Sequence, residues 1–186
     1  EVLAPSAETP SAHPLPFSRS YIVFIGTVIP RKRVDALIEL LAHESLNEYD
    51  LIVCGRLDDS AEHKKLISLA EGFRVASRVH FEGAVPPEMA AYYIRHAAAY
   101  VSASEFEGKP NAALEALAAG KVVFLSDIPA HKEIIEDGKS GALFKREHTP
   151  EAAQCLAKLL SDEAKSASMR QEAQKSVSHL TWERTA

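Results

Sequence analysis

The sequence predicts a doubly wound α/β fold in which a mostly parallel, six-stranded, Rossmann-like sheet carries helices on both faces. From residue 21 onward, short apolar runs of strand length alternate with amphipathic segments of helix length almost to the end of the chain. Strands separated by helices need crossover connections, so neighbouring strands should run parallel with both faces covered. A chain of 186 residues suits one such domain and is short for two.

Six apolar runs are the expected strands. In chain order they are YIVFIG (21–26), DLIVCG (50–55), VHFEG (79–83), YVSAS (100–104), KVVFLS (121–126) and GALF (141–144). The first three end in glycine, which is typical of a strand that turns into a loop.

The segments between these runs have the spacing of helices that lie on a sheet. The first, over about 32–42, places Val34, Leu37, Ile38 and Leu41 on one side. Leu66 marks the second helix. Further helices are expected near 87–97, from Pro110 onward, over 150–161 and over 163–178.

Composition excludes several classes of protein. The net charge of −5 and the pI of about 5.9 argue against a nucleic acid as partner, because such proteins present a net basic face. Cys54 and Cys155 lie among apolar neighbours and are expected to be buried core residues. No apolar run is long enough to span a membrane and no signal-like segment is present, so we predict a cytoplasmic protein.

The first stretch of the chain differs from the rest. It is rich in proline, serine and alanine, and we interpret residues 1–19 as a linker from a missing N-terminal domain. Residues 20–186 then form the folded domain, with its final helix truncated.

Four loops are expected to converge on a ligand, because doubly wound sheets bind ligands beyond the carboxyl ends of their strands. They are Gly26–Lys32, Gly55–Asp59, Gly83–Pro87 and Glu105–Pro110.

The last of these loops leads into a helix with an anion site at its start, in SEFEGKPNAALEALAAG (104–120). Pro110 suits the first turn, where its missing N–H needs no acceptor, and the alanines and leucines that follow are strong helix formers. Gly108 allows close approach of a ligand to the backbone. Free N–H groups around residues 109–113 would suit a diphosphate.

Two carboxylates flank this helix start. Glu107 precedes it and Glu115 lies within it, so both can contact one bound molecule. A carboxylate repels phosphate but accepts two hydrogen bonds from a vicinal diol, which assigns the pair to sugar and ribose hydroxyls. The competing interpretation is that both are solvated carboxylates near a helix N-terminus.

A basic cluster follows the first strand in FIGTVIPRKRVD (24–35). Arg31, Lys32 and Arg33 at a helix start would place cations where phosphate charge needs to be offset. The alternative is an ordinary solvated face.

These motifs resemble glycosyltransferase family 4, a group of retaining enzymes with the two-domain GT-B fold. The resemblance rests on the two glutamates with EG before PN and EA after it, and on the glycine and lysine of 24–35. It extends over about residues 21–186. In that family the first glutamate contacts the donor sugar and the second the ribose, which implies these roles for Glu107 and Glu115. Lys32 matches the phosphate-binding lysine.

The resemblance implies a donor site with Glu107 and Lys32 as its catalytic residues. The full set of implied donor-binding residues is Gly26, Thr27, Arg31, Lys32, Gly55, Gly83, Val85, Glu107, Gly108, Lys109, Pro110, Asn111, Ala112 and Glu115. Thr27 stands where many members have arginine, so either Arg31 substitutes or one phosphate contact is missing.

The implied activity is transfer of a hexosyl-type sugar, with retention, from a UDP-, GDP- or ADP-linked donor to a saccharide or lipid-linked acceptor in glycan or polysaccharide biosynthesis. No metal or other cofactor is expected, and the scattered histidines lack metal-ligand spacing. The acceptor, and any peripheral contact with the inner face of the membrane, would belong to the missing N-terminal domain, so this chain should bind donor but transfer nothing alone. The alternatives are a GT-B sugar-nucleotide epimerase and a non-catalytic nucleotide-sugar-binding module.

Overall fold

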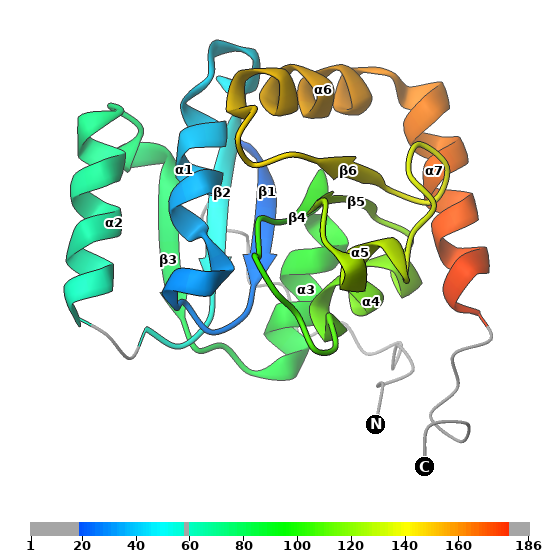
Figure 1. The fold of residues 1–186 in the computed structure, drawn as a ribbon, viewed down its shortest axis with the longest axis horizontal. Coiled ribbons are helices and arrows are strands. Elements are labelled where there is room, and N and C mark those ends of the chain that lie inside the picture. Colours follow the sequence, from blue (N-terminus) through cyan, green and yellow to red (C-terminus); the bar gives the residue numbers. More distant parts are fainter. Residues whose placement is uncertain (1–18, 58–59, 179–186) are drawn as a thin grey trace.

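A six-stranded sheet runs through the computed structural model, which describes residues 19–57 and 60–178 (Figure 1). Its strands are β1 (Ser20–Ile25), β2 (Tyr49–Cys54), β3 (Val79–Gly83), β4 (Ala99–Ser102), β5 (Val122–Ser126) and β6 (Ala142–Phe144). Every neighbouring pair is parallel. The predicted fold class is therefore confirmed. The predicted linker, except for residue 19, and the last eight residues lie outside the described ranges.

The strand order is β3-β2-β1-β4-β5-β6, so the chain first winds outward from β1 to β3 and then crosses back to β4. The direction of winding changes between β1 and β4, which pair through Ile22↔Ala99 and Val23↔Tyr100. In sheets of this kind the crevice at such a switch point is where ligands bind. The loops that follow β1 and β4 are therefore the first place to look for a site.

Helices cover both faces of the sheet (Figure 1). On one face lie α1 (Val34–Ala42), α2 (Ser60–Gly72) and α6 (Thr149–Ser161), and on the other α3 (Pro87–His96) and α4 (Asn111–Ala118). Helix α7 (Glu163–Val177) packs against α4 and α6 and contributes to the core on both sides.

The two core clusters follow from the alternation of side chains along the strands. In β1, Ile22 and Phe24 point toward α1, α2 and α6, whereas Tyr21 and Val23 point toward α3 and α4. Because helices cover both faces of the sheet, strand sequences such as that of β1 are continuous apolar runs and do not alternate between apolar and polar residues.

The first helix starts later than predicted. Residues Pro30–Lys32 form a separate 3₁₀ turn, η1, and Arg33 follows in the left-handed region with φ of 51°, so α1 begins at Val34. The three cations therefore precede α1 instead of occupying its first turn. Proline sets the tight turn, and the left-handed residue ends it.

Three further short helices were not predicted: η2 (Glu44–Leu46), η3 (Ala76–Arg78) and α5 (Pro129–Lys132). The expectation that both cysteines are buried is half wrong. Cys54 is buried in β2, but Cys155 is exposed. The buried stripe of α6 contains Ala152, Ala153, Leu156 and Leu159, and residue 155 lies to one side of it.

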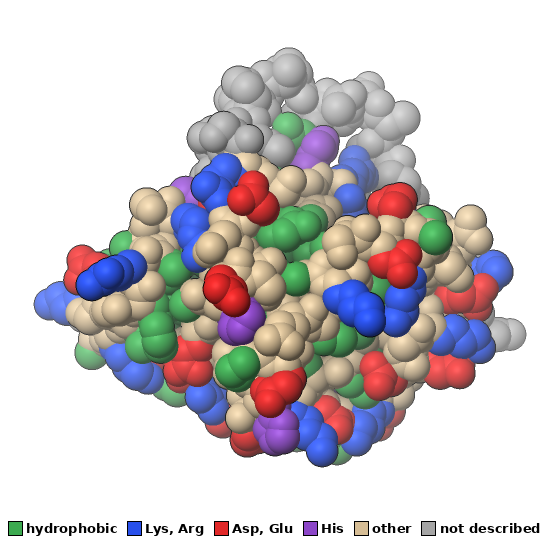
Figure 2. Space-filling model, turned by 90° about the horizontal axis from the view of Figure 1, so that it is seen from above, with side chains coloured by type: hydrophobic (Ala, Val, Ile, Leu, Met, Phe, Trp, Pro, Cys, Tyr) green, Lys and Arg blue, Asp and Glu red, His purple; other side chains and the backbone are tan. Residues whose placement is uncertain are grey.

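No helix in the described ranges is long and apolar enough to cross a membrane. Figure 2 views the molecule from above Figure 1, onto the end of the sheet opposite the carboxyl ends of the strands. Acidic, basic and hydrophobic side chains are interspersed there, and the described side chains in this view form no continuous area of one charge.

Candidate functional site

The loops after β1, β2 and β3 are joined by backbone hydrogen bonds. Gly26 donates to the carbonyl of Cys54 at 2.9 Å, Val28 to that of Arg56 at 2.9 Å, and Gly55 to that of Gly83 at 2.7 Å. A Cβ atom at position 55 would lie only 1.8 Å from the carbonyl oxygen of Gly26. Glycine is required there because the two loops touch backbone to backbone.

The loop after β4 is tied to the turn η1 after β1. The amide of Glu105 donates to the carbonyl of Arg31 at 2.9 Å, and the Arg31 guanidinium donates to the carbonyl of Phe106 at 2.9 Å. Arg33 Nη1 pairs with Glu105 Oε1 at 3.0 Å. These contacts join the segment after β1 to the loop after β4 at the switch point.

At the centre of this junction, Lys32 Nζ lies 2.5 Å from Glu107 Oε1. The same carboxylate oxygen accepts a hydrogen bond from Ser104 Oγ at 2.7 Å. The side chain of Glu107 is 9% exposed and that of Lys32 is 15% exposed, so water screens the pair weakly. No hydrogen bond from a described residue is directed to Glu107 Oε2. That oxygen remains able to accept hydroxyl hydrogens from a ligand.

The cations of η1 differ in how far their charge is already offset. Arg33 pairs with Asp35 and Glu105, and its hydrogen bonds to these acids raise its pKa above the ordinary value. Arg31 is exposed and forms no ion pair within the described part of the chain. The positive charge of Arg31, beside the Lys32–Glu107 pair, is therefore not offset by an acid of the described residues.

Helix α4 begins at Asn111 with Pro110 as its N-cap, and Gly108 and Lys109 in the preceding loop are exposed. First-turn amides such as that of Ala112 have no acceptor within the helix, and they carry the positive end of its dipole. The helix is confirmed but starts one residue later than predicted, so Pro110 precedes the first turn instead of occupying it.

Glu115 lies one turn into α4 on its exposed side. Desolvation by the surrounding protein nevertheless raises the pKa of its carboxyl above the ordinary value. Within the described ranges no cation pairs with it, in contrast to Glu107. Both its carboxylate oxygens can therefore accept hydrogen bonds from water or from a bound molecule.

The predicted donor residues are brought together to different degrees. Lys32 and Glu107 are in contact, and Arg31 lies in the adjoining turn. Gly26, Gly55 and Gly83 form the connected loop backbones, with Thr27 and the half-buried Val85 in the same loops. Gly108, Lys109, Pro110, Asn111, Ala112 and Glu115 belong to the start of α4.

Four residues behind Glu107 were not predicted to belong to the site. Three of them are fully buried, namely Ser104, Ser126 and His131, and Arg146 is half-buried. Hydrogen bonds to Ser104 or Ser126 connect the four residues. The only signal in the sequence was for the two serines, which are small polar residues at the ends of apolar runs.

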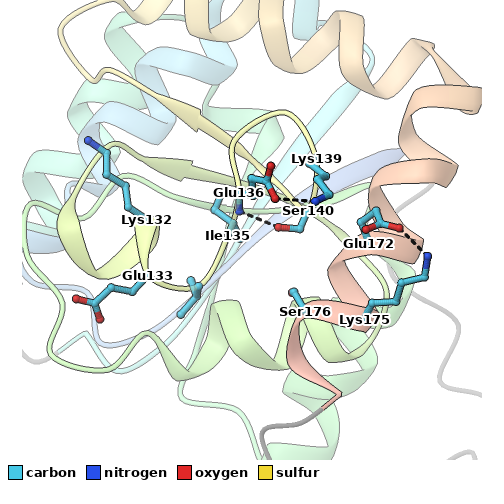
Figure 3. A pocket seen from close by; sticks show the side chains of 10 residues that line it. Lys132, Glu133, Ile135, Glu136, Lys139, Ser140, Glu172, Lys175 and Ser176 are labelled. Atoms are coloured by element: carbon cyan, nitrogen blue, oxygen red, sulfur yellow. Dashed lines mark hydrogen bonds and ion pairs between the residues drawn. The ribbon is translucent and has the colours of Figure 1, made fainter.

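A hollow of about 460 Å³ lies elsewhere, between the segment after α5 and helix α7 (Figure 3). Its charged groups are largely paired with each other: Lys139 with Glu136 at 2.8 Å and Lys175 with Glu172 at 2.6 Å. It shares no residue with the predicted donor site. In the described ranges, no group of three or more histidine, cysteine or acidic residues is placed to hold a metal ion.

A doubly wound parallel sheet with charged side chains gathered at its switch point defines a Rossmann-like α/β domain. The chain belongs to the family Glycosyl transferases group 1, whose sequence model matches residues 6–176.

Among curated relatives, the D-inositol 3-phosphate glycosyltransferase of Rhodococcus opacus (strain B4) is 28% identical over 171 residues. The match covers 89% of this chain but 38% of that relative, so the chain spans well under half of its length.

Solved structures of low sequence identity share the fold. Sucrose-phosphate synthase from Thermosynechococcus elongatus superimposes with a TM-score of 0.82 at 23% identity, over 91% of this chain and 43% of that one. Anabaena Alr3699/HepE, solved in complex with UDP-glucose, superimposes with a TM-score of 0.77 at 21% identity, over 87% of this chain and 44% of that one.

Proposed function

We propose that this chain is the donor-binding part of a retaining glycosyltransferase of family 4 type, and that it holds a nucleoside-diphosphate sugar at the switch point between β1 and β4. The observation that carries the proposal is the partly buried contact between Lys32 and Glu107, next to the N-terminus of α4. Cations for a diphosphate and a carboxylate for a sugar are thereby placed side by side.

The diphosphate is assigned to Lys32, Arg31 and the first-turn amides of α4 after that of Asn111, which already donates to the carbonyl of Lys109. An ammonium has three hydrogens, so Lys32 can keep its contact with Glu107 and still donate to a phosphate oxygen. Arg31 takes the place of the arginine that family members carry at the position of Thr27. The helix N-terminus adds a fixed positive potential.

The sugar and the ribose are assigned to the two glutamates. Glu107 would accept sugar hydroxyls through Oε2, because Oε1 is already engaged by Lys32 and Ser104. Glu115 would accept the ribose hydroxyls, because no cation among residues 19–57 and 60–178 pairs with it and both its oxygens can accept.

The chemistry in this proposal is mainly electrostatic. Departure of the diphosphate leaves an oxocarbenium-like sugar, and fixed positive groups around the phosphates stabilise the leaving group. Glu107 positions the sugar and offsets part of its developing charge. We propose a hexosyl-type donor linked to UDP, GDP or ADP, with no metal or other cofactor. The complex of Anabaena HepE with UDP-glucose supports this class of ligand.

We further propose that the acceptor, a saccharide or a lipid-linked molecule, binds to a part of the protein outside this chain. The chain matches only 38% of the length of the Rhodococcus opacus relative, which supports placing the acceptor site in another part of the protein. We place the whole protein in the cytoplasm, where contact with the inner face of the membrane would involve that other part. The chain alone should bind donor without transferring sugar, since half a cleft neither orients an acceptor nor excludes water.

Calorimetry with UDP, GDP, ADP and their glucose and mannose conjugates tests the proposal. One of these nucleotide sugars should bind to the 186-residue chain, with no product when saccharide acceptors are added. Failure of the whole panel to bind would overturn the proposal. Epimer formation, or release of nucleoside diphosphate by the whole protein without an acceptor, would favour a sugar-nucleotide epimerase. Binding of a nucleotide sugar by the whole protein with no turnover under any condition would favour a non-catalytic module.

A further inference from the structure

A buried polar network lies behind Glu107, at the carboxyl ends of three neighbouring strands. Ser104 follows β4, Ser126 ends β5, and Arg146 follows β6. The carbonyl of Ser104 accepts from Ser126 Oγ at 2.6 Å and from Arg146 Nη1 at 2.9 Å. These two bonds fix the backbone of Ser104, whose hydroxyl donates to Glu107 Oε1.

The chemistry of the donors and acceptors fixes the direction of each bond. Ser104 gives its one hydroxyl hydrogen to the Glu107 carboxylate, so Ser102, whose Oγ lies 3.1 Å away, must donate to Ser104. The Nδ1 atom of His131 lies 2.8 Å from the carbonyl oxygen of Ser126, which can only accept, so Nδ1 carries the hydrogen. The bonds that reach the Ser104 carbonyl and the bond from Ser104 to the carboxylate therefore each have one direction, and they end on Glu107.

Ser104 and Lys32 act on the same oxygen in different ways. The lysine ammonium sits on a flexible four-carbon stem and supplies charge with little angular restraint. The serine hydroxyl sits on a single carbon attached to a backbone that is itself held by two hydrogen bonds. Serine can therefore restrain the rotation of the carboxylate, which otherwise has a broad range of terminal torsion angles.

We propose that Ser104 is a positioning residue for donor recognition: by holding Glu107 Oε1 inward, it presents Oε2 to the sugar of the bound nucleotide. This role rests on the proposed function, because it assigns the sugar to Glu107. Ser104 itself does not touch the ligand, and it makes no contribution to diphosphate binding.

The test compares nucleotide sugar and nucleoside diphosphate binding to the 186-residue chain by calorimetry, using UDP-glucose with UDP, GDP-mannose with GDP, and ADP-glucose with ADP. Ser104→Ala should lower the affinity for the nucleotide sugar by about tenfold or more, as for loss of a hydrogen bond to a charged group. The affinity for the matching nucleoside diphosphate should stay within about twofold of the wild-type value. Ser104→Thr, which keeps the hydroxyl, should restore most of the loss.

A matched control is Ser166→Ala. Ser166 is also buried and donates to the carbonyl of Leu159 at 2.6 Å, in the α6–α7 region. This variant should lose thermal stability in the same way but keep the wild-type preference for the nucleotide sugar. If Ser104→Ala does not fold, Ser104→Cys, which keeps a weak donor, should show a smaller loss in the same direction.

A double-mutant cycle with Glu107→Ala, which removes the acceptor of the Ser104 hydroxyl, separates positioning from general stability. Because Ser104 acts through Glu107, adding Ser104→Ala to Glu107→Ala should cause little further loss of sugar binding. Additive losses, or equal weakening of nucleotide sugar and diphosphate by Ser104→Ala, would overturn the role of Ser104 while leaving the proposed function intact. Absence of nucleotide-sugar binding by the wild-type chain would overturn the proposed function itself, and the role of Ser104 with it.

Discussion

The ammonium of Lys32 lies 2.5 Å from the carboxylate of Glu107, although 75 positions separate them in the sequence. The first residue comes from the turn after β1 and the second from the loop after β4. The contact therefore bridges the two strands between which the winding of the sheet reverses. It brings a charge suited to phosphate and a group suited to sugar hydroxyls to one point.

The first prediction concerns the charge of Lys32. Nucleoside diphosphate should bind to the chain more tightly than the free nucleoside, and Lys32→Met should weaken the diphosphate by on the order of 1.5–3 kcal/mol, as for other charge-assisted bonds. Calorimetry at low and high salt measures both effects, and added salt should weaken wild-type binding. Lys64→Met, on the exposed side of α2, is the control and should change nothing. Equal affinities for diphosphate and nucleoside would contradict the assignment.

The second prediction concerns the close approach of Gly55 to Gly26. Gly55→Ala would place a methyl group 1.8 Å from a carbonyl oxygen, so one of the two loops must move. The free energy of unfolding should fall by about 1–3 kcal/mol or more, and nucleotide binding should weaken with it. Urea unfolding provides the measurement. Gly72→Ala is the control, because a Cβ there meets nothing within 4 Å; a similar loss in both variants would show that the contact is unimportant.

The third prediction concerns pH and His131. Burial lowers the pKa of its imidazole, an effect that its hydrogen bond to Ser126 and the charge of Glu107 partly oppose. The unfolded chain then takes up a proton at a higher pH than the folded one, so the free energy of unfolding falls as the pH drops below about 6.5. Stability contributed by the neutral ring is present above that pH.

His131→Asn should flatten this part of the pH dependence, because the amide can donate to the Ser126 carbonyl without titrating. Urea unfolding between about pH 8 and about pH 5 compares it with wild type. His96→Asn changes an exposed histidine of α3 and should keep the wild-type slope. If the free energy of unfolding depends on pH identically in wild type and His131→Asn, His131 is not the source of this pH dependence.

The fold was predictable because its strands and helices are encoded locally. Continuous apolar runs such as that of β1 mark strands buried on both faces, and the stripe of α1 marks its buried side. The position of Glu107 before α4 was also predictable, since Pro110 and the alanines that follow identify the helix start.

The details of the site depend on contacts between distant segments, which the sequence pattern does not encode. Nothing near Arg33 signalled its left-handed conformation, which delays the start of α1. Ser104 looked like the end of a strand, and its bond to Glu107 depends on the loop geometry after β4. Cys155 was predicted to be buried on the basis of its neighbours, but a helix exposes one side whatever residues lie next to it in sequence.

The separation of roles between Glu107 and Glu115 is the central claim, and paired calorimetric titrations of Glu107→Gln and Glu115→Gln test it most directly. Each substitution removes a charge but keeps the shape, and loss of a charge-assisted bond should cost on the order of 1.5–3 kcal/mol. Glu115→Gln should weaken the binding of nucleoside diphosphate and of nucleotide sugar alike, because both contain the ribose. Glu107→Gln should leave the binding of nucleoside diphosphate unchanged and weaken the binding of nucleotide sugar. Equal loss of diphosphate binding in both variants would contradict the assignment of sugar to Glu107 and ribose to Glu115.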